Sequence, residues 1–65
     1  MTQGERIKNL REKKKLTISE LAELVGISQP FMTGIERDYK SPSGAVAVRM
    51  AEVLGCTTDY IFAGK

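Results

Sequence analysis

The chain has 65 residues, of which 42% are hydrophobic and 28% are charged, and its formal net charge is +2. A chain of this length folds as one small domain, and this composition is typical of a globular protein. One cysteine and no histidine exclude a disulfide framework, a zinc cluster of the usual ligands and a histidine-based catalytic triad. No apolar run is long enough for a membrane span or a signal peptide. We therefore expect a cytoplasmic protein that is not an enzyme and holds no metal and no cofactor.

The positive charge is concentrated at the N-terminal end. Residues 1–15 carry six Lys or Arg and two Glu, whereas residues 16–36 carry three Glu and no Lys or Arg. The run Lys13-Lys14-Lys15 is typical of a solvated helix end, where cations interact favourably with the helix dipole. The alternative is that this run contacts phosphate groups.

Two capping patterns predict the starts of the first two helices. Thr2 and Glu5 have the spacing of a capping box, which predicts a helix that ends near Lys15. Thr17 and Glu20 repeat the pattern and predict a second helix. Its apolar residues recur with helical spacing, and a glycine follows where a left-handed residue would end the helix. These residues are Ile18, Leu21, Ala22, Val25 and Gly26.

A third helix is predicted to begin directly after this turn. Ser28 can cap it, and Pro30 lies in its first turn, where a missing N–H has no cost. Met32 and Ile35 are expected to bury one side of the helix. The solvent side is then made of Gln29, Pro30, Thr33, Gly34 and Arg37.

The remaining residues predict a loop and two more helices. Ser43 can cap a fourth helix that runs to Leu54, and Gly55 ends it. Thr57 can cap a short last helix, with Cys56 as a core residue at its start. The final residues, 63–65, are typical of a domain edge. The expected fold is all-α, a compact five-helix bundle that forms a single domain over residues 1–65.

The segment of about residues 18–37 has the pattern of a helix-turn-helix. Two short helices cross steeply only if the residue at closest approach is small, which Ala22 satisfies, and Gly26 gives the turn its backbone freedom. Met32 and Ile35 supply the apolar wedge between the helices. A second helix held in this way fits the DNA major groove. The alternative is a helical hairpin used only for packing.

The sequence resembles a known family at several short motifs along nearly its whole length. These motifs are Leu16-Thr17, Glu20-Leu21-Ala22, Gly26-Ile27-Ser28, Ile35-Glu36-Arg37, Pro42-Ser43 and Leu54-Gly55. They are similar to those of the Cro/C1-type helix-turn-helix regulators, the lambdoid phage repressor (XRE) family. The resemblance implies a lambda repressor-like DNA-binding domain that dimerises on an operator of two half-sites, with the third helix as recognition helix.

The resemblance also assigns roles to individual residues. Arg11 and Glu36 match positions that form a partly buried ion pair in the family, although Arg11 could instead contact a phosphate. At the first position of the second helix the family commonly has Gln, and this chain has Ile18, so one polar contact is missing. Base readout is expected from four residues of the third helix and its end. They are Gln29, Pro30, Thr33 and Arg37.

Phosphate contacts are expected where helices begin and in the loop after the third helix. Helix N-termini attract anions, and hydroxyl groups and cations bind phosphate oxygens. The predicted set is Thr17, Ser19, Ser28, Tyr39, Lys40, Ser41 and Ser43.

We expect two copies of this domain to form a dimer through the last helix. Tyr60, Ile61 and Phe62 follow one another and cannot all point into one core, so part of the last helix should lie at the surface. Thr58, Ile61 and Phe62 are the predicted dimer interface.

These observations predict a sequence-specific double-stranded DNA-binding transcriptional regulator. It would be a repressor or Cro-like switch protein that acts as a homodimer on a near-palindromic operator, without a small-molecule effector, and is associated with the nucleoid through DNA. The alternative is an antitoxin-like or other protein-interaction module on the same scaffold, which the absence of Lys and Arg from residues 16–36 leaves open. Salt dependence of binding distinguishes the two.

Overall fold

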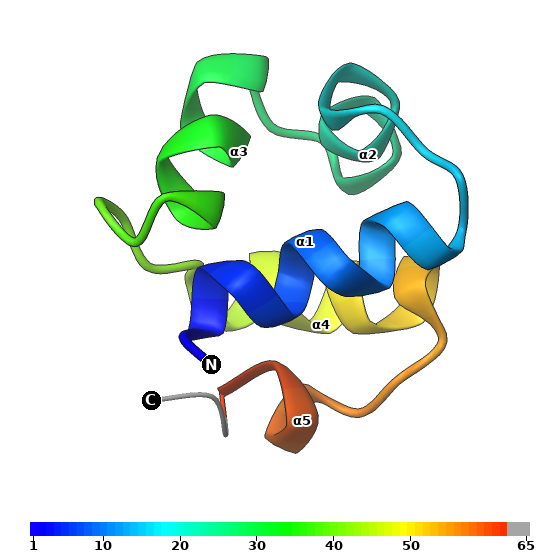
Figure 1. The fold of residues 1–65 in the computed structure, drawn as a ribbon, viewed down its shortest axis with the longest axis vertical. Coiled ribbons are helices and arrows are strands. Elements are labelled where there is room, and N and C mark those ends of the chain that lie inside the picture. The colour runs from blue at the N-terminus through cyan, green and yellow to red at the C-terminus, as the bar shows by residue number, and fades with distance from the viewer. Residues whose placement is uncertain (63–65) are drawn as a thin grey trace.

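The computed structural model describes residues 1–62, and the expected domain edge at residues 63–65 lies outside them. The described part contains five helices and no strand, which confirms the all-α prediction (Figure 1). The helices are α1 (Gln3–Lys13), α2 (Ile18–Val25), α3 (Gln29–Glu36), α4 (Gly44–Leu54) and α5 (Thr58–Phe62). None of these helices has the length and apolar character needed to cross a membrane.

All five helices begin where the capping residues predict. In each case a hydroxyl oxygen accepts a hydrogen bond of 3.0–3.3 Å from the backbone N–H three residues later. This bond satisfies one of the donors that the first helical turn leaves unpaired. At α1 and α2 the Glu side chain also accepts from the backbone of the cap, completing both capping boxes. The capping residues are Thr2, Thr17, Ser28, Ser43 and Thr57.

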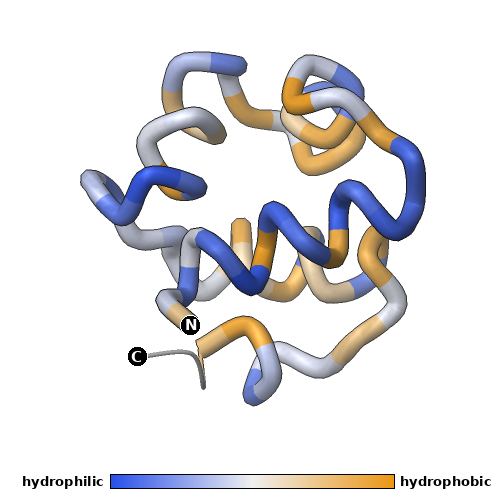
Figure 2. Tube along the Cα trace, viewed as in Figure 1, coloured by the Kyte–Doolittle hydropathy of each residue, from blue (hydrophilic) through white to orange (hydrophobic). Residues whose placement is uncertain are grey.

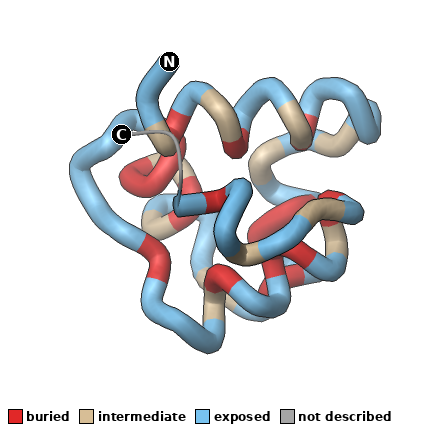
Figure 3. The backbone as a smooth tube through the Cα atoms, turned by 90° about the horizontal axis from the view of Figure 1, so that it is seen from below, coloured by how far each residue is buried: buried red, intermediate tan, exposed pale blue. Residues whose placement is uncertain are grey.

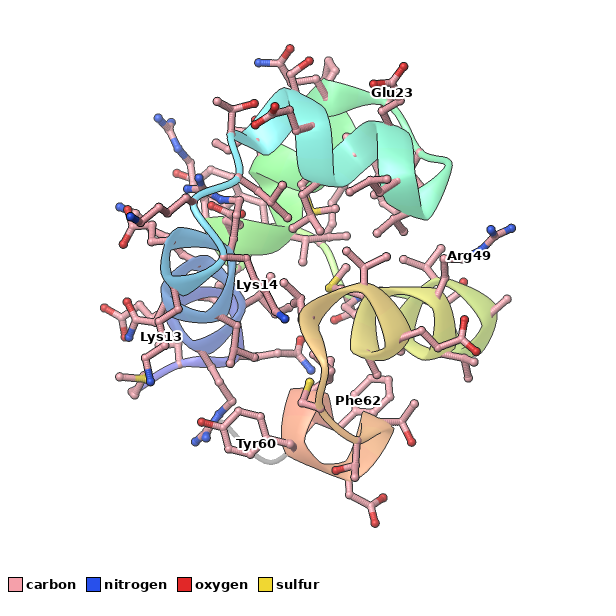
Figure 4. All side chains as sticks on the ribbon, turned by 90° about the vertical axis from the view of Figure 1, so that its right-hand side faces the viewer. Lys13, Lys14, Glu23, Arg49, Tyr60 and Phe62 are labelled. Carbon is pink, nitrogen blue, oxygen red and sulfur yellow. The ribbon has the colours of Figure 1, made fainter. Side chains whose placement is uncertain are left out.

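Two helices end at glycines, as predicted. Gly26 (φ 87°) and Gly55 (φ 72°) take the left-handed conformation and end α2 and α4. Helix α1 ends at Lys13, earlier than the predicted end near Lys15. Lys15 is itself left-handed (φ 59°), so it turns the chain out of the helix. In Figure 4 the side chain of Lys14 extends toward the end of α4, so this cation faces the negative end of that helix dipole.

The helices are arranged around one apolar core. Helices α1 and α4 cross the middle of the molecule, α2 and α3 cover one side, and α5 covers the other (Figure 1). Figure 2 shows that α1 is largely hydrophilic whereas α2 and α4 carry more hydrophobic residues, and Figure 3 shows buried residues alternating with exposed ones along the helices. The core residues are Ile7, Leu21, Ala22, Val25, Met32, Ile35, Ala47, Met50, Ala51, Leu54 and Ile61. Each large one contributes about 1.5–3 kcal/mol by its burial.

Cys56 packs at the edge of this core, as expected for a residue at a helix start. Burial raises the pKa of its thiol above the ordinary value. A raised pKa keeps the sulfur protonated and a poor nucleophile at neutral pH. The environment of Cys56 therefore supports a packing role.

A contact between distant parts of the sequence joins the start of α1 to the end of α3. The N–H of Gly4 donates to Asp38 Oδ1 at 2.9 Å, and Asp38 is left-handed (φ 65°). A Cβ atom at Gly4 would overlap the carbonyl of Glu36 and lie 2.7 Å from the carbonyl oxygen of Ile35. The two helices can approach this closely only because residue 4 has no side chain.

Asp38 makes the stability of the fold depend on pH in the acid range. Hydrogen bonds from the Thr2 hydroxyl and the Gly4 N–H hold the pKa of Asp38 below its ordinary value of 3.8. The ionised carboxylate therefore stabilises the fold above about pH 3.8, and this contribution is lost as the pH falls from there through the lower folded-state pKa.

We expect Asp38→Asn to reduce the difference in urea midpoint between pH 6 and pH 3. An unchanged difference would show that other carboxylates account for the acid dependence.

Candidate nucleic-acid interface

The pair of helices α2 and α3 is held rigidly by the turn between them. The backbone N–H groups of Gly26 and Ile27 both donate to the carbonyl of Ala22, at 2.8 and 3.0 Å. Ala22 is 2% exposed, and Met32 and Ile35 of α3 are buried beside it. A small residue on α2, a left-handed glycine and an apolar wedge are together the geometry of a helix-turn-helix. The orientation of α3 is thus set by the core.

The predicted outer face of α3 is exposed at most, but not all, of its positions. Gln29, Pro30 and Arg37 are exposed, and Thr33 is half-buried. Gly34 was predicted on the solvent side, and this is wrong: it is buried. The cause is the side chain of Lys40, whose carbon atoms would lie 3.1–3.4 Å from a Cβ atom at Gly34. The loop after α3 therefore folds back onto the helix.

Some of the hydroxyl groups predicted to contact phosphates also cap helices. Thr17, Ser28 and Ser43 accept hydrogen bonds from backbone N–H groups as helix caps. A hydroxyl has one hydrogen to donate as well as lone pairs to accept, so capping leaves the donor free for a phosphate oxygen. Ser19, Tyr39 and Ser41 are also exposed, so their hydroxyl groups are available as donors too.

Arg11 and Glu36 form the buried ion pair that the resemblance implies. Arg11 Nε donates to Glu36 Oε2 at 2.8 Å, and Nη2 donates to Oε1 at 3.2 Å. Arg11 Nη1 also donates to the carbonyl of Leu16 at 2.7 Å. The guanidinium is therefore engaged on three sides and joins α1, the α1–α2 turn and the end of α3. This arrangement favours the structural role of Arg11 over a phosphate contact.

Cations beside α3 come from other parts of the chain, because residues 16–36 contain none. A hollow of about 260 Å³ lies between α1, the start of α2 and α3. Its lining includes the exposed Lys8 and Arg37, the half-buried Ile18 and Thr33, and the Arg11–Glu36 pair. The apolar Ile18 fills part of the position where the family commonly has Gln. One flank of α3 is therefore bordered by two exposed cations, which suits a polyanion.

Sequence reasoning missed Lys8 as a component of this site. Lys8 and Arg11 are three residues apart on one helix, so they lie on the same side of α1. Because Arg11 was predicted to meet Glu36 of α3, the same spacing could have placed Lys8 beside α3. No sequence pattern predicts the contact of Lys40 with Gly34, because the path of a loop does not follow a regular spacing of residues.

The predicted dimer interface needs one correction. Ile61 is fully buried in the core of its own chain and cannot also face a partner. Tyr60 and Phe62, its neighbours, are 42% and 40% exposed, and Thr58 is half-buried. In Figure 4 Tyr60 lies on the α1 side of α5 and Phe62 on the α4 side. The Arg6 guanidinium lies 4.5 Å from the centre of the Tyr60 ring, which is a cation–π distance.

Comparisons with known proteins agree with this geometry. A family model described as helix-turn-helix matches residues 7–61. The immunity repressor protein of Bacillus phage phi105 is 39% identical over 61 residues, which cover 94% of this chain and 42% of that protein. The structure is also similar to the c2 repressor of Salmonella phage P22 in complex with a synthetic operator, with a TM-score of 0.94, 31% identity and coverage of 100% and 98% of the two chains.

A third similarity is to SinR of Bacillus subtilis in complex with DNA. The TM-score is 0.85 at 31% identity, with coverage of 92% of this chain and 97% of that chain. The chain spans less than half the length of the first curated relatives that it matches, between 28% and 48%. These relatives are named as repressors and transcriptional regulators.

Proposed function

Because the chain belongs to the Cro/C1-type helix-turn-helix family, we propose that it binds a double-stranded DNA operator in a sequence-specific manner and acts as a transcriptional repressor or Cro-like switch. One observation carries the proposal: the core holds α3 in a fixed orientation while Gln29, Pro30 and Arg37 remain exposed on its outer side. An exposed helix fixed in this way is what major-groove recognition requires.

Phosphate groups on either side of the groove would position the protein. The exposed hydroxyl groups and the N-termini of α2 and α4 supply hydrogen-bond donors, and Lys8 and Arg37 supply charge. The set comprises Thr17, Ser19, Ser28, Tyr39, Ser41 and Ser43. These contacts carry affinity and register, whereas α3 carries specificity.

Two copies are needed to select an operator. One recognition helix makes too few base contacts to compete with the nonspecific sites of a genome. We assign the dimer interface to the exposed part of α5. It comprises Thr58, Tyr60 and Phe62, and the buried Ile61 is left out. A two-fold dimer of this class places its half-sites roughly 10–10.5 bp apart. Phe62→Glu should then weaken operator binding and make it first-order in protein, while the helical content of the folded domain is retained.

Selection of bound sequences from random duplex DNA tests the proposal. We expect a near-palindromic sequence to be enriched, and the logarithm of its affinity to fall linearly with the logarithm of the salt concentration. A protein-interaction module would show no enriched sequence and a much weaker salt dependence. That result would favour the alternative function.

Gln29→Ala is expected to weaken binding to the selected operator by about 1–3 kcal/mol and to relax the preference at one base pair per half-site. The reason is that a Gln amide can donate to and accept from adenine N7 and N6 in the major groove. Binding measured on the operator and on its single-base-pair variants checks this. Ser19→Ala is the matched comparison, since loss of a phosphate contact weakens all sequences alike. An unaltered base preference in Gln29→Ala would remove this residue from the readout.

A further inference from the structure

The loop after α3 places the side chain of Lys40 along that helix. The backbone N–H groups of Tyr39 and Lys40 both donate to the carbonyl of Gly34, at 2.8 and 3.2 Å, so the loop turns back at once. A Cβ atom at Gly34 would lie 3.1 Å from Cδ, 3.2 Å from Cγ and 3.4 Å from Cε of Lys40. The aliphatic part of Lys40 therefore covers the position where a side chain of residue 34 would begin.

The ammonium group of Lys40 is directed toward the N-terminal half of α3. Its Nζ atom lies 5.9 Å from the centre of the Phe31 ring, one turn before Gly34. Pro30 and Gly34 are four residues apart and lie on the same side of the helix, which is exposed at Pro30 and covered by Lys40 at Gly34. The end of Lys40 thus lies near Phe31 in the first turn of α3. The N-terminal residues of a recognition helix are those that contact base edges.

Residue 34 contributes no side chain of its own to this side of α3. Proline and glycine, at positions 30 and 34, leave α3 with only a few side chains that can read bases. The lysine side chain lies over Gly34, and it brings three N–H donors. Guanine presents two acceptors, O6 and N7, in the major groove, and lysine pairs with them.

We propose that Lys40 reads a guanine base, as a side chain of α3 would, in place of the phosphate contact that its loop position predicts. The inference rests on the proposed function, because it concerns the same DNA site. Gly34 is a positioning residue for this contact, since any Cβ atom there meets the lysine side chain. The operator should then contain one G·C pair per half-site whose recognition depends on a residue outside α3.

Two variants test the inference, one by removing the charge of Lys40 and the other by disturbing the position of its side chain. Lys40→Met keeps most of the aliphatic side chain and removes the ammonium group. Gly34→Ala keeps every charge and crowds the lysine side chain, whose carbon atoms must shift by a few tenths of an ångström. Dissociation constants are measured for the selected operator and for its variants at each base pair. We expect the wild type to prefer one G·C pair by roughly 5- to 160-fold. Lys40→Met should lose that preference and Gly34→Ala should reduce it, while all other preferences stay.

Lys13→Met is the matched control, because Lys13 lies at the end of α1 in the hollow that Tyr60 also lines. It removes the same charge by the same substitution and should leave every base preference unaltered. Thermal unfolding of all three variants shows whether they are folded. A double variant of Gly34→Ala and Lys40→Met should lose no more preference than Lys40→Met alone.

Two results would overturn the inference. If Lys40→Met weakens all sequences equally and lowers the salt slope by about one, Lys40 binds a phosphate, and the proposed function stands. If Lys40→Met leaves both the base preference and the affinity unaltered, Lys40 only packs on α3. By contrast, a wild type that enriches no sequence would contradict the proposed function itself, and this inference with it.

Discussion

Glu36→Leu is expected to destabilise the fold by about 3–5 kcal/mol, because it leaves the buried guanidinium of Arg11 without its counter-charge. Arg11 is only 8% exposed and donates two hydrogen bonds to this carboxylate. A cation of this kind cannot recover its hydration without opening the contact between α1 and α3. In a domain of this size such a loss lowers the melting temperature by roughly 12 °C or more.

Thermal and urea unfolding of Glu36→Leu measure the effect, and a double variant separates its causes. Arg11→Met combined with Glu36→Leu removes both charges and keeps the volume apolar, so it should be more stable than Glu36→Leu alone. Some cost remains, because the carbonyl of Leu16 also loses the hydrogen bond from Arg11. A loss below about 1 kcal/mol in the single variant would show that the pair behaves as an exposed salt bridge.

Gly4→Ala is the second substitution with a large expected effect. The new Cβ atom would overlap the backbone carbonyl of Glu36 and come within 2.7 Å of that of Ile35. Backbone atoms of α3 cannot move aside as a flexible side chain can. We expect a loss at or above the upper end of the usual 1–3 kcal/mol for overpacking. The hydrogen bond from the Gly4 N–H to Asp38 would be lost as α1 moves away.

Gly44→Ala is the matched control for Gly4→Ala. Gly44 is also a helical glycine near an N-terminus, but it is exposed and a Cβ atom there has nothing within 4 Å. Alanine at this position should leave stability unchanged or raise it by about 0.4–1 kcal/mol, through the entropy of the unfolded chain. Urea midpoints of the two variants provide the comparison. Equal midpoints would contradict the close approach of α1 to α3.

The order of the five helices and the helix-turn-helix could be predicted because their determinants are local. A cap such as Thr17 bonds to a backbone N–H only three residues away, and Gly26 ends α2 through its own backbone angle. The end of α1 was misplaced because the residue that leaves the helix, Lys15, takes a left-handed backbone angle without being a glycine. Helical periodicity also placed Gln29, Pro30 and Arg37 correctly at the surface, but not Gly34, which the loop after α3 covers.

The last helix shows where periodicity stops being sufficient. Three consecutive apolar residues indicate that part of α5 is exposed, and this holds for Tyr60 and Phe62. Which of the three is buried depends on how a helix of five residues packs against α1 and α4. The prediction that Ile61 faces a partner failed for that reason.

The sequence by itself determined where the helices of this protein begin, which side of each is apolar and how α2 joins α3, because these features depend on hydrogen bonds and spacings within a few residues. Only the tertiary structure decided the contacts between distant residues. Gly4 meets Asp38 across 34 positions, and Lys40 covers Gly34 because its loop turns back onto α3. Such contacts depend on how helices pack and how loops close, and no local pattern encodes them.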